Sequence, residues 1–364
     1  MPNKTKVKIS EKFINHPLFN EKVCGMNFGF LSKRGYYERE ETLKQPKIMS
    51  EYGVNWVTLN LNICQEKYFS DNIFLDFEYS VSELELYEIT KELKACGIKI
   101  LFKPCLTPLD GQWMGAVNFP ETGKQIQGLN IDYWGKWFAS FKKAVVYFSK
   151  LSEKLQFDAL LIGAEYFGTE SRDEEWRTVI AEARKYYGGP VSYEFTPDSH
   201  KTYELKWFNE LDFLSYSFYP PACGGANIKN PAINPEFTAK QMSEYLQKCK
   251  EEITGLSQRF GNKPILFTEY GIRSAHGCIM QPYNFLWKTY YDGEEQANYM
   301  EASFKTFWEL PEWLGLLWWK WDETQDRPHY KTDPKGDMGF TVQGKPAQAV
   351  LKKWFAETKK STDK

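Results

Sequence analysis

The stretch Lys263-Pro-Ile-Leu-Phe-Thr-Glu-Tyr-Gly-Ile-Arg273 has the pattern of a short buried strand that ends in a charge. Pro264 precedes the run, and apolar or β-branched residues fill it. Because side chains alternate along a strand, Ile265, Phe267 and Glu269 are expected on one face. A carboxylate at the end of a core strand is costly unless it is paired or used. For a single glutamate, a structural ion pair is the commoner explanation.

A second stretch, Phe157-Asp-Ala-Leu-Leu-Ile-Gly-Ala-Glu-Tyr166, is built in the same way and ends at Glu165, with Leu161 and Gly163 expected on its face. Two or three strand–helix units fit between this stretch and Glu269. If the strands are parallel neighbours in one closed sheet, both carboxylates emerge at the same carboxyl-terminal rim. Two carboxylates that face each other across a pocket are the equipment for glycoside hydrolysis, one as nucleophile and one as a proton donor with a raised pKa.

Strand-like runs alternate with helical patterns along the whole chain. The runs cover residues 23–30, 54–64, 98–107, 157–166, 190–197, 211–220, 264–272 and 315–322. Eight such runs predict parallel βαβ units and, at this length, a closed (β/α)8 barrel of the TIM type. Residues 80–96 and 131–155 show helical stripes of apolar residues. No linker-like segment appears before residue 359, so we expect one catalytic domain over residues 1–358 and a frayed tail over residues 359–364.

The composition excludes several classes of function. The 364 residues include 46 basic and 48 acidic side chains, which gives no electrostatic reason to bind nucleic acid or an anionic membrane. No apolar run is long enough to span a bilayer, and no signal peptide is visible at the start. Seven scattered cysteines suit a reducing compartment, so a soluble cytoplasmic protein is expected. The sequence does not indicate an oligomeric state.

Metal and cofactor chemistry is not expected either. The four histidines are dispersed and none forms a pair with metal-ligand spacing. The glycine pairs lack the flanking pattern of a phosphate or dinucleotide loop, so no cofactor is predicted. The absence of a Gly-rich loop after the last two strands also argues against a phosphate-binding barrel enzyme. Aromatic residues make up 17% of the chain, and flat rings that line a cleft suit the C–H faces of sugars.

Polar and aromatic residues stand at the ends of other predicted strands: Asn60, Asn62, Lys103, Tyr219, Trp319 and Trp321. Each has a structural alternative, because a strand-end amide can satisfy loop backbone, a lysine can form an ion pair, and tryptophans can cap a barrel. Together, on the rim that holds both glutamates, they favour a polar pocket with an aromatic floor. Glu194, at the end of the fifth strand, is the one rival carboxylate.

Several stretches carry a resemblance to a known family. They are Gly25-Met-Asn-Phe-Gly29, Val54-Asn-Trp-Val57, Lys103-Pro104, Ile162-Gly-Ala-Glu165, Trp176-Arg177 with Tyr187, Trp318-Trp-Lys-Trp321 and Gly339-Phe-Thr-Val-Gln-Gly-Lys-Pro-Ala347. On these residues the chain resembles clan A of the glycoside hydrolases and, more narrowly, family 113, the β-mannanases. The last of these stretches is the most specific. The resemblance implies a (β/α)8 barrel in which Glu165 is the acid/base and Glu269 the nucleophile.

From these residues and this resemblance we expect a metal-independent retaining β-glycosidase that acts on β-1,4-linked, mannose-containing chains. In it, Tyr219 orients the nucleophile, Lys103 and the two strand-end asparagines bind hydroxyls, and Trp319 or Trp321 stacks beneath the sugar. Two departures from the family pattern concern the substrate. Ala164 replaces the asparagine that many clan members carry, and Tyr216 stands where a smaller polar or acidic residue is expected. The same chemistry on a β-glucan or xylan, or a barrel that binds sugar without cutting it, are the alternatives.

Overall fold

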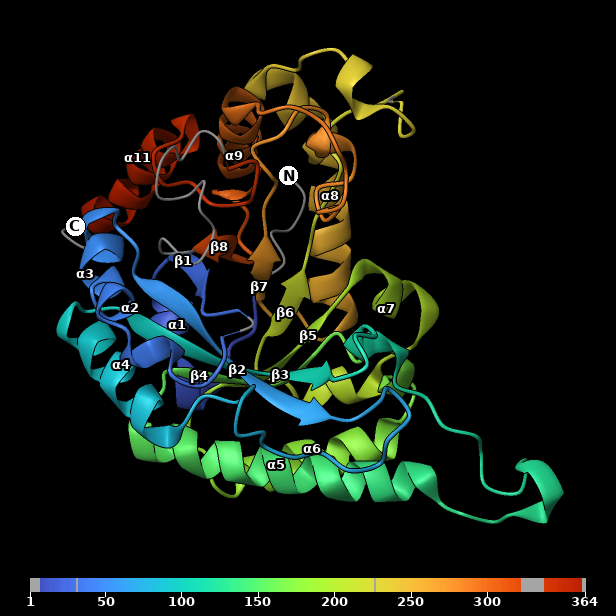
Figure 1. Cartoon of the computed structure of the whole chain (residues 1–364). Helices are drawn as coiled ribbons and strands as arrows, with labels where there is room; N and C mark the ends of the chain where they lie inside the picture. The colour runs from blue at the N-terminus through green and yellow to red at the C-terminus, as the bar shows by residue number, and fades with distance from the viewer. Residues whose placement is uncertain (1–6, 31, 226, 322–336, 362–364) are drawn as a thin grey trace.

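The computed structural model describes residues 7–30, 32–225, 227–321 and 337–361. Eight parallel strands form one closed barrel in sequence order, and β8 pairs with β1 to close it (Figure 1). The strands are β1 Val23–Phe28, β2 Trp56–Gln65, β3 Lys99–Pro108, β4 Ala159–Ala164, β5 Val191–Phe195, β6 Leu214–Ser217, β7 Ile265–Tyr270 and β8 Trp313–Trp321. The predicted (β/α)8 barrel is confirmed. The sequence also predicts a long loop over residues 323–345, and this segment lies partly outside the described residues.

Helices surround this barrel. The α-helices are α1 Pro17–Asn20, α2 Glu40–Leu43, α3 Gln45–Glu51, α4 Glu83–Ala95, α5 Tyr133–Leu155, α6 Asp173–Arg184, α7 Pro197–Thr202, α8 Ala239–Arg259, α9 Gly293–Phe307 and α11 Pro346–Ser361. Short 3-10 turns are η1 Glu11–Phe13, η2 Tyr36–Glu38, η3 Met114–Ala116, η4 Ile126–Gly128, η5 Phe167–Thr169, η6 Lys206–Glu210, η7 Pro231–Ile233 and η8 Cys278–Met280. Helix α11 therefore continues past residue 359, where we expected a tail; residues 362–364 lie outside the described part.

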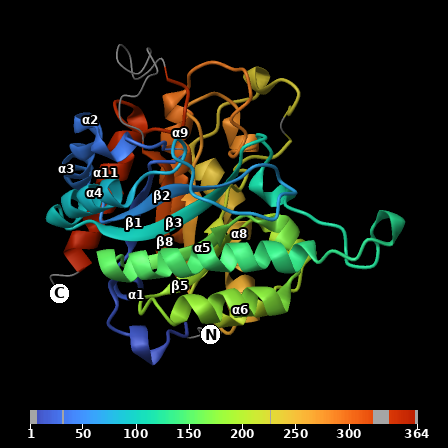
Figure 2. The ribbon, with the colours of Figure 1, turned by 60° about the horizontal axis from the view of Figure 1, so that its bottom comes forward.

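Helix α5 shows how the outer ring is attached. The Asp132 carboxylate caps the helix by accepting from the Gly135 amide at 2.8 Å, and Gln156 ends it in the left-handed region. The predicted stripe of the helix is buried, and its Phe141 meets Trp176 of α6 edge to face with centroids 5.4 Å apart. Figure 2 shows α5 and α6 lying side by side against the barrel. Burial of these rings fixes both helices to the strands.

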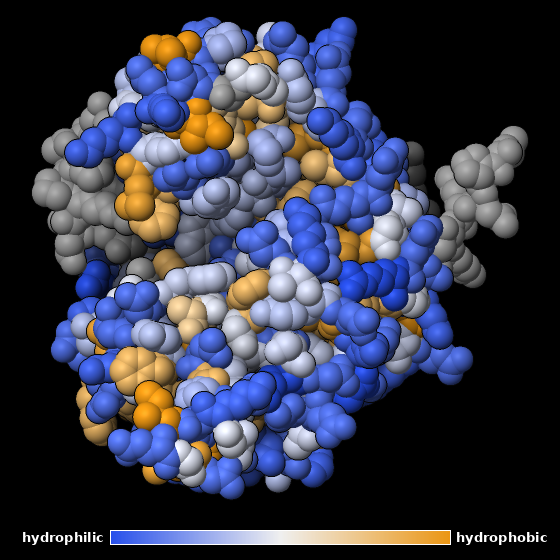
Figure 3. Space-filling view, turned by 90° about the vertical axis from the view of Figure 1, so that its right-hand side faces the viewer, coloured by the Kyte–Doolittle hydropathy of each residue, from blue (hydrophilic) through white to orange (hydrophobic). Residues whose placement is uncertain are grey.

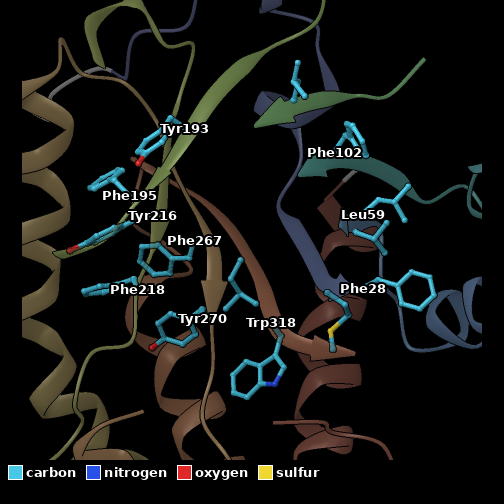
Figure 4. Packing of buried hydrophobic residues seen from close by; sticks show 14 of the residues in the cluster. Phe28, Leu59, Phe102, Tyr193, Phe195, Tyr216, Phe218, Phe267, Tyr270 and Trp318 are labelled. Carbon is cyan, nitrogen blue, oxygen red and sulfur yellow. The ribbon is translucent and has the colours of Figure 1, made fainter. Parts of the chain in front are cut away.

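The hydrophobic core has two layers. A smaller cluster inside the barrel takes apolar residues from the strands, among them Trp56, Leu101, Leu161, Leu266 and Leu317. A larger cluster lies between the strands and the helices, and much of it is aromatic. Figure 4 shows part of this outer layer, with Phe28, Leu59, Phe102, Tyr193, Phe195, Tyr216, Phe218, Phe267, Tyr270 and Trp318 labelled.

This layering corrects the expected alternation in β7. Ile265 and Phe267 belong to the outer layer, whereas Leu266 points into the barrel. Glu269 reaches the pocket nonetheless, because the pairing of β7 with β6 shifts register between Phe267 and Glu269. An extra residue in one strand turns the side chains that follow it to the other face. Strand β4 shifts register in the same way between Leu161 and Ala164. Leu161 faces the barrel interior as expected, but a Cβ atom at Gly163 would lie against Tyr166 and Tyr193 of the outer layer, so the expected position of Gly163 is wrong.

The outer surface is mostly polar. Figure 3 shows a face on which hydrophilic residues predominate and hydrophobic ones stand singly or in small groups. Among the helices of the described residues, none is both long enough and apolar enough to cross a membrane.

Candidate active site

A pocket of about 1370 Å³ opens where the strands end at their carboxyl termini. The ends of β4, β6, β7 and β8 contribute to its walls, together with the loops that follow most of the strands and with helices α7 and α8. Glu165, Tyr219, Glu269 and Trp319 line it, so four of the predicted residues meet in one place. This is the rim on which barrel enzymes carry their active sites.

Both carboxylate oxygens of Glu269 are held by neighbouring side chains. The Lys103 ammonium donates to Oε1 at 2.5 Å, and the Tyr219 hydroxyl donates to Oε2 at 3.0 Å. Burial raises the pKa of Tyr219 well above its usual value, and the charge of Glu269 adds to that shift, so the phenol remains a donor. The arrangement fixes the orientation of the Glu269 carboxylate, as predicted for Tyr219.

Glu165 stands directly after β4 with its backbone in the left-handed region, at φ 58°. The backbone around it is fixed: its own amide donates to the Glu194 carbonyl at 2.8 Å, and the Tyr166 amide donates to the Tyr193 hydroxyl at 2.7 Å. Burial raises the pKa of Glu165, and the nearby charge of Glu269 raises it further. A carboxyl group with a raised pKa is suited to donate a proton at neutral pH.

The two glutamates lie close together. One carboxylate oxygen from each of Glu165, Glu194 and Glu269 falls within 4.8 Å of the others. Retaining glycosidases place their two carboxyl groups about 5–5.5 Å apart, whereas inverting ones leave about 6.5–9.5 Å for a water. The spacing therefore fits direct attack by one of the carboxylates.

The rival carboxylate, Glu194, has a different environment. It is fully buried, its Oε1 accepts from Lys103 at 2.5 Å, and its Oε2 has no hydrogen-bond partner among the described residues. Burial raises its pKa to about 8, while the charge of Lys103 acts in the opposite direction. Burial alone would lower the pKa of Lys103, but the carboxylates of Glu194 and Glu269 outweigh that effect and raise it. Lys103 thus bridges two carboxylates. Its predicted role in binding sugar hydroxyls is wrong, because it is 1% exposed, lies outside the pocket lining and has its ammonium held by both glutamates.

A second group of possible metal ligands is occupied by protein contacts. His276 places Nδ1 2.9 Å from Asp292 Oδ2 and Nε2 2.9 Å from the Asn234 carbonyl, so both ring nitrogens have partners. Glu295 accepts from the backbone amides of Gly277 and Ile279. These bonds tie the loop after β7 to the start of α9, which is a structural role.

The predicted sugar-binding role of the two asparagines is wrong. Asn60 is 1% exposed and donates to the Phe28 carbonyl at 2.8 Å, and Asn62 is 3% exposed and donates to the Ser32 carbonyl at 2.8 Å. The carbonyl oxygen of Asn62 in turn accepts from the Thr107 hydroxyl at 3.3 Å. Both side chains satisfy backbone and neighbouring groups behind the pocket, which was the structural alternative.

The structure also separates the two predicted tryptophans. Trp319 lines the pocket, where its ring meets Phe30 edge to face with centroids 4.5 Å apart. Trp321 is 1% exposed, donates to Gln45 Oε1 at 3.0 Å and packs against Tyr52 outside the barrel. Trp321 therefore cannot stack beneath a sugar. The physical reason is a register shift, since three residues of β8 from Trp318 onward span only two positions of β1.

Other pocket residues were not singled out from the sequence: Trp113, Met114, Ser217, Arg273, Tyr283 and Phe285. Several lie in the loops over residues 107–130 and 272–294, whose length and aromatic and glycine content predict a functional rim, but nothing in the sequence ranks one aromatic residue above another. The departure at Tyr216 does not line the pocket: the residue is buried, and its hydroxyl donates at 2.6 Å to Glu252, which does line it. Ala164 is buried at the end of β4.

Comparison with known proteins identifies the family. The sequence model of Glycoside Hydrolase Family 113 matches residues 26–345. A solved family 113 β-1,4-mannanase is 24% identical, with a TM-score of 0.78, and the match covers 92% of this chain and 99% of that one. A family 113 β-mannanase from Alicyclobacillus acidocaldarius, in complex with ManMIm, is 22% identical, with a TM-score of 0.78 and coverage of 93% and 98%.

A more distant structure has the same fold. A family 5 mannosidase from Rhizomucor miehei is 13% identical, with a TM-score of 0.64, and the match covers 98% of both chains. A search of curated proteins found no match. The family match spans most of the barrel and includes both rim glutamates. The chain therefore belongs to Glycoside Hydrolase Family 113, and it is a glycoside hydrolase.

Proposed function

We propose that this glycoside hydrolase is a retaining β-1,4-mannanase in which Glu269 is the nucleophile and Glu165 the acid/base. The observation that carries the mechanism is the spacing of the two carboxylates, whose nearest oxygens lie within 4.8 Å of each other. The environments of the two residues support the assignment of roles. Glu269 is held by Lys103 and Tyr219, while Glu165 has a raised pKa.

In the first step, an oxygen of Glu269 attacks the anomeric carbon as the bond from that carbon to the glycosidic oxygen breaks. The proton of Glu165 passes to the departing oxygen, so the leaving sugar is released as an alcohol. In the second step, Glu165 takes a proton from water while the water oxygen bonds to the anomeric carbon. The ester bond to Glu269 breaks, the carboxylate is regenerated, and the product keeps its β configuration.

The pocket also suits a carbohydrate in shape and lining. Its volume of about 1370 Å³ accommodates several sugar rings, and Trp319 and Phe30 supply aromatic surface beside the two glutamates. The assignment to β-1,4-linked mannose rests on the family and on the β-mannanases that share the fold. Ala164 cannot bond a 2-hydroxyl, so another group on the rim would hold it. We assign this role to Ser217, a polar residue of the lining that lies beside Glu165.

The experiment is hydrolysis of a panel of β-1,4-linked manno-, gluco- and xylo-oligosaccharides, with the anomer of the first product read by NMR. Manno-oligosaccharides should be cut with retention. A clear preference for gluco- or xylo-oligosaccharides would exclude the mannanase assignment but leave the two-glutamate mechanism. Inversion would exclude the mechanism as well.

We further propose that the protein acts as one catalytic domain in the cytoplasm, on short imported oligosaccharides, and that it binds no nucleic acid. All seven cysteines are free, which suits a reducing compartment, and the near balance of acidic and basic residues gives nucleic acid no attraction. Cell fractionation tests the compartment, and recovery of the protein mainly from the medium would contradict it.

A further inference from the structure

Trp113 is an exposed aromatic residue in direct contact with Glu165. It lies in the loop between β3 and α5, immediately before η3, and lines the pocket. Its indole Nε1 donates to Glu165 Oε2 at 3.2 Å, although 48% of its surface remains exposed. A tryptophan with this much exposed surface at the mouth of a pocket leaves ring area free for a ligand.

The indole ring of Trp113 packs directly against Gly115, a residue without a side chain. A Cβ atom added at Gly115 would lie 2.3–2.5 Å from three atoms of the Trp113 ring, so only glycine fits there. Phe167 of η5 stacks beside the indole, with centroids 6.5 Å apart and planes 25° apart. The segments around η3 and η5 are themselves in close contact, because a Cβ at Gly168 would lie 2.0 Å from the Val117 carbonyl oxygen. The indole is therefore held in place before any ligand arrives.

The proposed role of Glu165 as the acid determines which part of a substrate lies beside it. An acid catalyst protonates the glycosidic oxygen, so the departing sugar must lie on the side of the pocket that holds the acid. A ring hydrogen-bonded to that acid is next to the leaving group. The flat face of an indole matches the C–H face of a sugar ring.

We propose that Trp113 serves the leaving-group side of the site in two ways: its N–H positions the Glu165 carboxyl, and its ring binds the departing sugar. This inference rests on the proposed function and adds a positioning residue and a sugar-binding subsite to it. The hydrogen bond fixes one oxygen of Glu165, which leaves the other to exchange the proton with the glycosidic oxygen. The ring places that oxygen by holding the sugar to which it belongs.

The two roles are separable by substitution. Trp113→Phe keeps an aromatic ring and removes the N–H, while Trp113→Ala removes both. Ile126→Ala is the matched control, because Ile126 belongs to the same loop, is 84% exposed and lies outside the pocket lining. The substrates are β-1,4-mannotetraose and a β-mannosyl fluoride, whose leaving group is a single atom that needs little protonation and offers no ring to stack.

For mannotetraose, Trp113→Phe should lower kcat/KM about tenfold, the effect of one hydrogen bond to a charged group. Trp113→Ala should lower it about a further tenfold and raise KM, because the stacking surface is lost as well. Both losses should be much smaller for the fluoride. Ile126→Ala should match the wild type on both substrates, and thermal unfolding should show that all variants are folded.

The pH profile gives a readout that a structural role would not move. An N–H that bonds the carboxylate favours its charged form, so Trp113→Phe should raise the pKa of Glu165 and move the basic limb of kcat/KM to higher pH. The other titratable groups that face Glu165 are unchanged in this variant: Glu269, Lys103, Cys105, Glu194, Glu170 and Tyr219.

Equal losses on mannotetraose and the fluoride, with an unmoved basic limb, would overturn the inference while leaving the proposed function intact. If the wild-type protein cleaved neither substrate, the proposed function would fail and the inference with it. A loss in Trp113→Ala without one in Trp113→Phe would contradict the positioning role and retain only the subsite.

Discussion

The ammonium of Lys103 lies 2.5 Å from a carboxylate oxygen of Glu194, and both side chains are at most 1% exposed. The same ammonium lies 2.5 Å from Oε1 of Glu269, so Lys103 and Glu194 form a buried ion pair next to the proposed nucleophile. Lys103→Met should lower kcat at least about 100-fold and destabilise the protein by about 3 kcal/mol, because buried carboxylates lose their partner. Steady-state kinetics and denaturant unfolding measure the two effects.

Glu194→Gln should reduce activity less than Lys103→Met does. The amide keeps a hydrogen-bond acceptor for Lys103, and residue 194 does not line the pocket, so turnover should fall only about tenfold. A loss as large as that of a nucleophile variant would show that Glu194 takes part in the chemistry itself.

Loss of Glu269 should reduce activity on all substrates alike, whereas the effect of losing Glu165 should depend on the leaving group of the substrate. Glu269→Ala should abolish turnover of all substrates, since no covalent intermediate can form. Glu165→Ala should spare aryl glycosides with good leaving groups much more than oligosaccharides, since those need less protonation. Kinetics with nitrophenyl glycosides and oligosaccharides test this. Similar losses on both substrate classes would argue against the assigned roles.

The pH dependence follows from the raised pKa of Glu165. The first step needs this carboxyl protonated, so kcat/KM for oligosaccharides should be sustained below its pKa and fall as pH rises through it. Because burial and the charge of Glu269 raise that pKa, the basic limb should lie above the ordinary range of a glutamate. In Glu165→Ala, assayed on an activated aryl glycoside, this limb should disappear. Its persistence would assign it to another group.

The two tryptophans of β8 should give opposite phenotypes. Trp319→Ala should raise KM with little change in the free energy of unfolding, because the ring lines the pocket. Trp321→Ala should lower the free energy of unfolding by about 3–5 kcal/mol, because it empties a buried site outside the barrel. Thermal melting together with kinetics distinguishes them. A binding defect in a stable Trp321→Ala protein would reverse our correction.

Activity should also be unchanged by chelators. The carboxylates that could gather a divalent ion at the rim already face the Lys103 ammonium. Inactivation by EDTA that a divalent ion reversed would show that the carboxylate cluster binds a metal.

The sequence was sufficient for the architecture because long apolar runs and helical stripes depend only on local patterning. It located both glutamates and Tyr219 because each was expected where a strand ends. It also placed Lys103 beside them, but not its role: Lys103 is buried in the middle of β3, where its ammonium is held by Glu194 and Glu269. It failed wherever a strand shifts register. Strict alternation places Phe267 on the face of Glu269 and Trp321 on the face of Trp319. Register shifts in β7 and β8 separate both pairs, and nothing in the local sequence predicts these shifts.

The predicted sugar-binding role of Asn60 and Asn62 was wrong for another reason. A buried amide that bonds a backbone carbonyl and one that bonds a sugar look the same in a sequence. What decides between them is the path of the neighbouring loop, here the carbonyls of Phe28 and Ser32. Trp113 was missed because its contact with Glu165 depends on the fold of a long loop.

The left-handed backbone at Glu165 has a consequence for how this scaffold changes over time. Asparagine and glycine tolerate this conformation, whereas β-branched residues are strongly disfavoured in it and other residues incur about 1–2 kcal/mol. Asparagine is therefore the replacement that removes the acid while leaving the turn, Tyr166 and the pocket in place. That one substitution would turn the enzyme into a protein that binds its oligosaccharide without cleaving it.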